Sequence, residues 1–328
     1  MATTQRFAVS VLLTLLGAIA AERGAALAQP WPQKPIKLVV PFAPGGAVDG
    51  VARLFTTKFQ ESLKVPVVVE NRAGAGGNIG VDLVAKSPPD GYTILLNTNG
   101  QAISPATYKS LPWDPFRDFI PVTQLLATNM LFVTSPKLPV NNLQEFFALA
   151  KAKPGALNYA SSGIGNALHL TFELLKLRTG ADIQMVPFRG DGEIINALVA
   201  GQVEAALIPI STGRAQVESG AIKGLAVTTL QRARGLEQIP TVAEQGLPGF
   251  NAAGWQSLFV PAKTPKEIVD RIYREAKAAL AAPDVLQRLE GFSVIPVGST
   301  PEEFAAVYKA DVESFRKIVQ EARIPLQE

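Results

Sequence analysis

The residue types that most often carry catalysis or bind metals are scarce in this sequence. The chain has 328 residues and no cysteine, and His169 is its single histidine. A metal site built from nitrogen and sulfur ligands is therefore excluded, and proton transfer would depend on His169 or on a carboxylate such as Asp49. Ser161 and Ser162 precede His169 but do not form the Gly-x-Ser-x-Gly nucleophile elbow. We expect no metal, no cofactor and no catalytic residue.

Two glycine-containing loops offer binding chemistry instead. The first is 41–49 (PFAPGGAVD) and the second is 161–166 (SSGIGN), and each lies between an expected strand and an expected helix. The first-turn N–H groups of a helix lack partners and the helix dipole is positive there, so such a loop favours an anion. A single loop of this kind is explained by the glycine and polar cap that any strand–helix turn needs. Two of them, one in each presumed lobe, favour a ligand bound between them.

A third glycine-rich segment, 72–80 (RAGAGGNIG), does not predict nucleotide binding. Its glycines do not match the Gly-x-Gly-x-x-Gly register, and it lacks the Lys-Ser/Thr pair of a phosphate loop. We expect a tight structural turn with close packing of a helix on a sheet.

The elements that must position these loops alternate between strands and helices. Strands are expected at 36–40, 66–70, 92–96, 130–134, 157–160, 183–187, 204–208, 225–228 and 292–297. Helices are expected at 48–62, 79–86, 142–153 and 166–178, and capping boxes at 264–267 and 300–303. This alternation predicts right-handed strand–helix–strand units in mainly parallel sheets.

The length and pattern of the chain predict two α/β lobes. The apolar segments 122–126 and 255–260 are interpreted as crossings between lobes. Lobe 1 is then 29–128 together with 252–328, and lobe 2 is 129–251.

The N-terminal residues are typical of a secretory signal peptide. Arg6 precedes an apolar run, 7–21, and Ala26 and Ala28 form an A-x-A exit. We expect cleavage after Ala28 and a mature protein free in the periplasm. The whole chain has a net charge of +3, and removing 1–28 leaves 29 basic against 27 acidic residues (31 − 2 and 28 − 1). Nucleic acid is not an expected partner.

Several segments, in order along the mature chain, resemble one family of receptors. They are 31–46 (WPQKPIKLVVPFAPGG), 69–80 (VENRAGAGGNIG), 89–93 (PDGYT), 114–119 (DPFRDF), 150–155 (AKAKPG), 159–163 (YASSG), 225–228 (LAVT) and 240–244 (PTVAE). They are similar to the Bug-type receptors, the extracytoplasmic subunits of tripartite tricarboxylate transporters. The resemblance implies a type II periplasmic binding fold, with two α/β lobes and a cleft that holds a carboxylate between the two loops.

The resemblance also implies a set of ligand-binding residues. In the first loop these are Phe42, Ala43, Pro44, Gly45, Gly46 and Asp49, and in the second they are Ser161, Ser162, Gly163, Gly165 and Asn166, with His169 just behind. Two positions depart from the family. Ile208 stands where an aspartate is frequent, and Phe188-Arg189 stands where a tyrosine commonly precedes lysine.

These departures predict the kind of acid that is bound. With Ile208 and Phe188 near the distal part of the ligand, a buried ammonium group would have no partner there. We expect a carboxylate or dicarboxylate without an α-amino group, with an apolar or aromatic middle near Phe188 and Ile208. Arg189 either binds a second carboxylate or points to solvent or to Asp191. The expected partners are the membrane subunits of a secondary transporter, and the receptor is expected to be a monomer. The alternatives are an enzyme on the same bilobal fold and an orphan receptor used for sensing.

Overall fold

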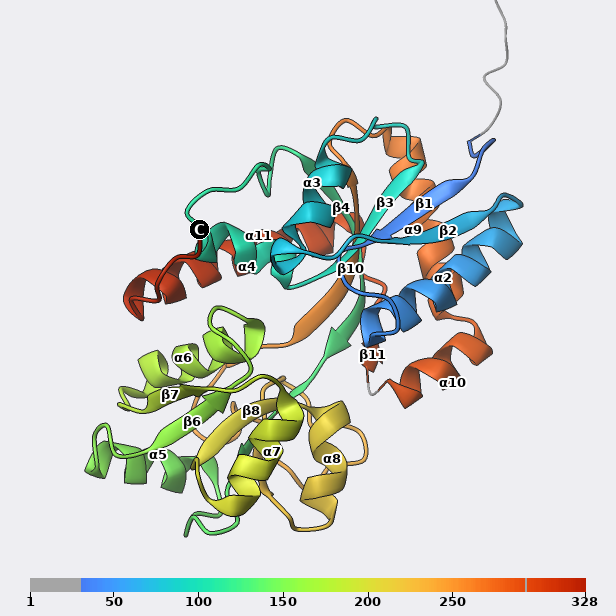
Figure 1. The fold of residues 1–328 in the computed structure, drawn as a ribbon. Helices are drawn as coiled ribbons and strands as arrows, with labels where there is room; N and C mark the ends of the chain where they lie inside the picture. The colour runs from blue at the N-terminus through green and yellow to red at the C-terminus, as the bar shows by residue number, and fades with distance from the viewer. Residues whose placement is uncertain (1–30, 293) are drawn as a thin grey trace, which may run out of the picture. The chain divides into compact units, whose positions relative to one another are not determined.

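Figure 1 shows the computed structural model of the protein, which describes residues 31–292 and 294–328. The predicted signal peptide, 1–28, lies outside the described residues. The strands β1–β11 and the helices α2–α11 all lie within Lys34–Glu328, which form one compact unit. No helix in the described part of the chain combines the length and apolar character that a membrane crossing needs.

The first sheet has six strands and draws on both ends of the described chain. Its strands are β1 (Ile36–Val40), β2 (Val67–Asn71), β3 (Thr93–Thr98), β4 (Phe119–Thr128), β10 (Gly254–Pro261) and β11 (Val294–Pro296), in the order β11-β4-β10-β3-β1-β2. β1 is parallel to β2 and β3, whereas β10 is antiparallel to β3 and β4, and β11 to β4.

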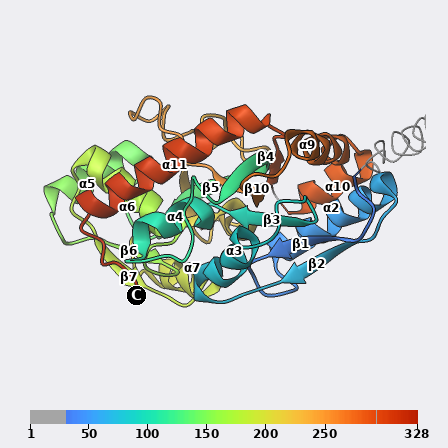
Figure 2. The same ribbon diagram turned by 90° about the horizontal axis from the view of Figure 1, so that it is seen from above.

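Helices pack on this sheet through apolar side chains. The helices are α2 (Ala47–Leu63), α3 (Asn78–Ala85), α4 (Gly100–Thr107), α9 (Lys266–Leu280), α10 (Pro283–Gly291) and α11 (Pro301–Glu321). α2 and α9 contact each other and the sheet (Figure 2). Trp255 and Phe259 of β10 pack against Phe304 and Tyr308 of α11, with ring centroids 5.2 to 6.3 Å apart. Burial of these large rings anchors α11 on the centre of the sheet.

The second sheet has five strands, all from the middle of the chain. They are β5 (Met130–Thr134), β6 (Asn158–Ser161), β7 (Gln184–Pro187), β8 (Ala205–Pro209) and β9 (Lys223–Val227), in the order β7-β6-β8-β5-β9. β6 is parallel to β7 and β8, and β5 is antiparallel to β8 and β9.

Helices cover both faces of this sheet because successive strand residues point to opposite sides. Phe132 packs against Phe146 of α5 (Leu143–Ala152) and Phe172 of α6 (Ala167–Thr179). Its neighbour Leu131 belongs to a different buried cluster, which includes Ile194 from α7 (Asp191–Ala200). The remaining helix of this region is α8 (Ile210–Glu218). Both faces of the sheet are thus apolar, which explains the near-continuous hydrophobic runs in the sequence.

The two sheets are joined at more than one place. Asn129 alone separates β4 of the first sheet from β5 of the second, and the chain returns between β9 and β10. A further apolar cluster, here called the bridging cluster, links α6 with helices of the first sheet. It consists of Ile103, Ala106, Leu170, Ile318, Val319 and Ile324. The elements of the two sheets are therefore packed on each other along α4, α6 and α11.

Most expected elements are present, and two expectations about them are wrong. The two α/β lobes are confirmed, but the sheets are mixed rather than mainly parallel, because β10 and β11 in the first sheet and β5 in the second run against the other strands. The capping box at Thr300 is confirmed, with Glu303 N donating to Thr300 Oγ1 at 3.2 Å. The one at Thr264 is wrong. Its hydroxyl donates to the carbonyl of Pro261 at 2.7 Å instead, and α9 begins without a side-chain cap.

Candidate functional site

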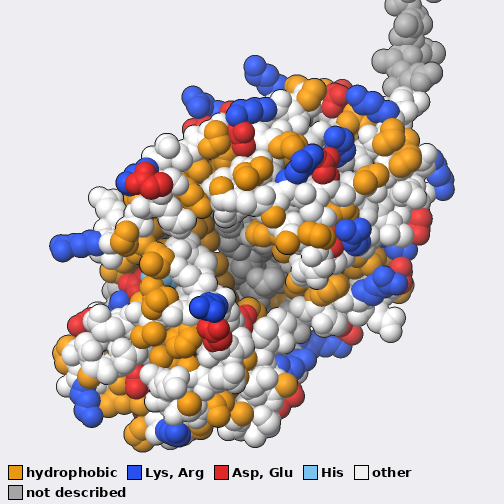
Figure 3. Space-filling model, viewed as in Figure 1, with side chains coloured by type: hydrophobic (Ala, Val, Ile, Leu, Met, Phe, Trp, Pro, Cys, Tyr) orange, Lys and Arg blue, Asp and Glu red, His pale blue; other side chains and the backbone are white. Residues whose placement is uncertain are grey.

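A cavity of about 530 Å³ lies between the elements of the two sheets. Figure 3 shows the hollow on the face seen in Figure 1. From the first sheet it is lined by residues 98–100, α4 and 254–256, and from the second by 162–168. Residues 128–130, at the junction of β4 and β5, also line it. Its volume suits a small organic ligand.

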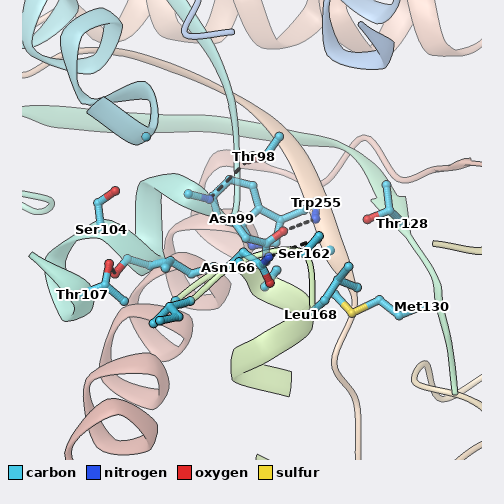
Figure 4. A pocket seen from close by; sticks show the side chains of 18 of the residues that line it. Thr98, Asn99, Ser104, Thr107, Thr128, Met130, Ser162, Asn166, Leu168 and Trp255 are labelled. Carbon is cyan, nitrogen blue, oxygen red and sulfur yellow. Dashed lines mark hydrogen bonds between the residues drawn. The ribbon is translucent and has the colours of Figure 1, made fainter. Parts of the chain in front are cut away.

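The lining of this cavity is uncharged and combines apolar side chains with neutral polar groups. None of the described residues that line it is a lysine, arginine, histidine, aspartate or glutamate. Hydroxyl and amide groups are supplied by Thr98, Ser104, Thr107, Ser162 and Asn166 (Figure 4). A charged ligand in this cavity would therefore be held by hydrogen bonds and helix dipoles rather than by an ion pair.

The second predicted loop presents the start of α6 to the cavity. Asn166 is the N-cap residue, and its Oδ1 accepts the backbone N–H of His169 at 2.9 Å. The first two residues of the helix, Ala167 and Leu168, line the cavity. Their N–H groups have no acceptor within the helix, and the dipole is positive at this end. Ser162, Gly163, Gly165 and Asn166 of the predicted site lie at the cavity, which gives this loop the chemistry to bind a carboxylate.

His169 supports this loop from behind rather than lining the cavity. Its Nδ1 accepts the backbone N–H of Gly165 at 2.9 Å, and the residue is 5% exposed. Burial lowers the pKa of His169, which keeps its ring neutral and Nδ1 free to accept. Ser161 is likewise buried, with its hydroxyl donating to the carbonyl of Gly163 at 3.1 Å. Both side chains fix the loop, and direct ligand contact by either stays a prediction.

The first predicted loop is not among the described lining of the cavity, and residues 43–46 are exposed. Asp49 organises this loop from inside. Its Oδ2 accepts the N–H of Gly45 at 3.0 Å and Nε of Arg53 at 2.9 Å, while Oδ1 accepts Nδ2 of Asn71 at 3.0 Å. The same Asn71 amide donates to the carbonyl of Phe42 at 3.1 Å. Asp49 therefore shapes the loop, and contacts between residues 42–46 and a ligand stay predictions.

We expect the replacement Asp49→Asn to destabilise the protein by about 2 kcal/mol at neutral pH, the size of a charge-assisted hydrogen bond. The hydrogen bonds from Arg53, together with those from Gly45 and Asn71, lower the pKa of Asp49 from 3.8 to about 2 against the effect of burial. A lowered pKa stabilises the fold above pH 4, and this contribution is lost as the pH falls toward 2.

Denaturant unfolding of the wild-type and Asp49→Asn proteins between pH 2 and 7 measures this contribution. The difference in unfolding free energy between the two proteins should shrink as the pH falls from about 4 to about 2, the interval between the ordinary and lowered pKa values of Asp49. A difference that stays constant over the whole range would contradict the proposed role of the carboxylate.

The three residues predicted at the distal end of the ligand are not among the residues that line the described cavity. Ile208 is fully buried and belongs to the cluster under α7 and α8, because it follows Leu207 on β8 and points to the other face. Phe188 packs against the same cluster. Arg189 is exposed, and its backbone N–H donates to Glu193 at 3.1 Å. Contacts of these residues with a ligand have no support from this arrangement and stay predictions.

Sequence reasoning missed most of the residues that the first sheet contributes to the cavity. Thr98 ends β3, Asn99 follows it, and Gly100 opens α4. Oδ1 of Asn99 accepts the backbone N–H of Trp255 at 2.6 Å, which ties this turn to β10 (Figure 4). Polar residues and glycine at the carboxyl end of a parallel strand were the signal that could have found this turn. The expected tight turn at 72–80 is confirmed, since a Cβ on Gly80 would lie 2.9 Å from the carbonyl of Arg72, and its Gly76 also lines the cavity.

Two α/β lobes, with an uncharged cavity between them onto which a helix N-terminus faces, define a solute-binding protein of the periplasmic type. Residues 51–324 match the tripartite tricarboxylate transporter family receptor. The chain belongs to this family of periplasmic receptors. The expected resemblance is thereby confirmed, and so is the expectation of a receptor rather than an enzyme.

Individual relatives agree with this assignment. The chain is 34% identical over 321 residues to Protein BugT of Bordetella pertussis, covering 96% of this chain and 98% of that protein. Among solved structures, R. palustris Rpa4515 with adipate is 32% identical at a TM-score of 0.74, covering 90% of this chain and all of that one. MatC from Rhodopseudomonas palustris with bound malate is 31% identical at a TM-score of 0.70, covering 88% of this chain and all of that one.

Proposed function

We propose that this protein captures a small carboxylate or dicarboxylate without an α-amino group and delivers it to the membrane subunits of a tripartite transporter, with no chemistry on the ligand. The observation that carries the proposal is the uncharged cavity onto which α6 opens with its Asn166-capped N-terminus. Two relatives of known structure hold dicarboxylates, adipate and malate. An orphan receptor that only senses the same acid would use the same cavity.

In this proposal the ligand carboxylate lies at the start of α6, against Ser162, Gly163 and Asn166. The first loop, 42–46, reaches the ligand from the other side when the cleft closes. Asp49 and His169 act by holding the two loops, as their hydrogen bonds to Gly45 and Gly165 support. A second carboxylate would be met by neutral donors of the cavity such as Thr98 and Ser104.

The remaining parts of the proposal concern the processing and organisation of the chain. Cleavage after Ala28 would release the mature receptor into the periplasm, where we propose that it is a monomer. The lobes are proposed to be 29–128 with 252–328, and 129–251. Sheet membership supports these boundaries, since the chain passes from the first sheet to the second between β4 and β5 and returns between β9 and β10.

The absence of acidic side chains from the described cavity lining supports a ligand without an amino group. A buried ammonium ion needs a carboxylate or several carbonyl partners, because an unpaired buried charge is very costly. A carboxylate, in contrast, is stabilised by backbone N–H groups and by the positive end of α6.

We expect dicarboxylates to raise the melting temperature of the purified protein more than their amino analogues do. The measurement is a thermal-shift panel of matched pairs, succinate with aspartate and adipate with 2-aminoadipate, with malate added. Binding to the native state raises its stability by mass action, so the ranking of shifts reports the ranking of affinities. Larger shifts with the amino acids would show that the assigned ligand class is wrong.

A further inference from the structure

The segment that follows α11 reaches the ligand cavity and touches both sides of it. Ile324 is buried in the bridging cluster, which fixes the start of the segment on α4 and α11. Three residues further on, Gln327 lies at the cavity itself. This segment belongs to neither of the two glycine loops and was not anticipated from the sequence.

The backbone of Gln327 is bound to the end of α4. Its N–H donates to the carbonyl of Thr107 at 2.7 Å, and its carbonyl accepts the N–H of Lys109 at 3.0 Å. These two bonds form a parallel bridge between Gln327 and Tyr108. Glu328 adds an ion pair with Lys109. The position of Gln327 is therefore set by elements of the first sheet.

The side chain of Gln327 extends to the loop that precedes α6. Its Nε2 donates to the carbonyl of Ile164 at 3.4 Å. A Cβ placed on Gly165 would lie 3.2 Å from this Nε2 and 3.1 Å from Cγ2 of Thr107. The loop that belongs to the second sheet is thus packed directly on an amide that belongs to the first.

We propose that Gln327 is a positioning residue for ligand binding, which holds the loop 162–166 in the geometry that receives the carboxylate. The inference rests on the proposed function of this loop. His169 holds Gly165 from the side of α6, and Gln327 holds Ile164 from the side of α4. The loop 162–166, which these two residues hold, carries the groups that face the ligand, so its order before binding reduces the entropy lost on binding.

The replacement Gln327→Met tests this role, since it removes the donor, keeps the length and neutrality of the side chain, and leaves both backbone bonds in place. Gln320→Met, on an exposed position of α11, is the matched control. Hydrogen–deuterium exchange of ligand-free protein should show about fivefold faster exchange of amides 162–166 in Gln327→Met only, the factor expected for one neutral hydrogen bond.

Titration calorimetry with adipate and with malate then tests the consequence for binding. The acid that binds the wild-type protein should bind Gln327→Met severalfold more weakly and Gln320→Met unchanged. Unaltered exchange in Gln327→Met would overturn the proposal, and faster exchange with unaltered affinity would overturn the part that concerns binding. If neither acid binds the wild-type protein, the choice of ligand in the proposed function fails, while the exchange measurement still decides whether Gln327 holds the loop.

Discussion

Replacement of Gly165 by valine should weaken carboxylate binding by about a hundredfold, through strain and overlap in the loop before α6. The φ of Gly165 is +77°, a region that β-branched residues rarely adopt. A Cβ there would also lie 3.1 Å from Cγ2 of Thr107 and 3.2 Å from Nε2 of Gln327. The loop must therefore move away from α4, and the bond from Gly165 to His169 must weaken.

Gly180→Val is the matched control for this experiment. Gly180 ends the same helix at a φ of +70°, but no atom lies within 4 Å of the position that a Cβ would take. Both replacements introduce the same backbone strain, so both should lower the melting temperature. Only Gly165→Val should lower the affinity for the acid selected in the thermal-shift panel, measured by calorimetry. Equal affinities for the two variants would remove Gly165 from the binding site.

The second large effect is expected from Leu170→Ala in the bridging cluster. Leu170 is fully buried, and it joins α6 to α4 and α11. Removal of a buried leucine side chain costs about 3 kcal/mol of unfolding free energy, because a cavity is left in the core. The loss should also loosen the packing between the elements of the two sheets, so that the ligand-free protein opens further.

Leu175→Ala separates these two consequences. Leu175 lies on the same helix and is equally buried, but its contacts are within the core of the second sheet. Denaturant unfolding should show similar destabilisation of the two variants. Small-angle scattering without ligand should show an increased radius of gyration only for Leu170→Ala. Unchanged radii for both would mean that the bridging cluster does not restrain opening.

The core of the fold was predictable because it depends on local patterns. Runs such as Ile36–Val40 and Met130–Thr134 are strands with the bounds that the sequence predicted. The direction of β5 and β10 was not predictable in the same way. It depends on the path of the chain between two sheets, which no local pattern specifies.

The candidate site was likewise only partly predictable from the sequence. The loop before α6 could be predicted, because glycine and an Asn166 cap at a strand–helix junction have a direct physical meaning. Ile208 could not be placed, since a strand buried on both faces has no polar alternation to show which face a residue occupies. Gln327 could not be found at all, because its approach to Ile164 depends on a contact between residues 163 positions apart.

The position of β10 constrains the order in which this protein folds. β10 lies between β3 and β4 in the first sheet, yet it begins 126 residues after β4 ends (254 − 128). The five strands of the second sheet are consecutive in the chain, so that sheet can assemble while β3 and β4 still have unpaired edges. Contacts between residues far apart in sequence form slowly, and open strand edges promote aggregation. During synthesis from the N-terminus, the chain would therefore depend on protection of the free edges of β3 and β4 until β10 is complete at residue 261.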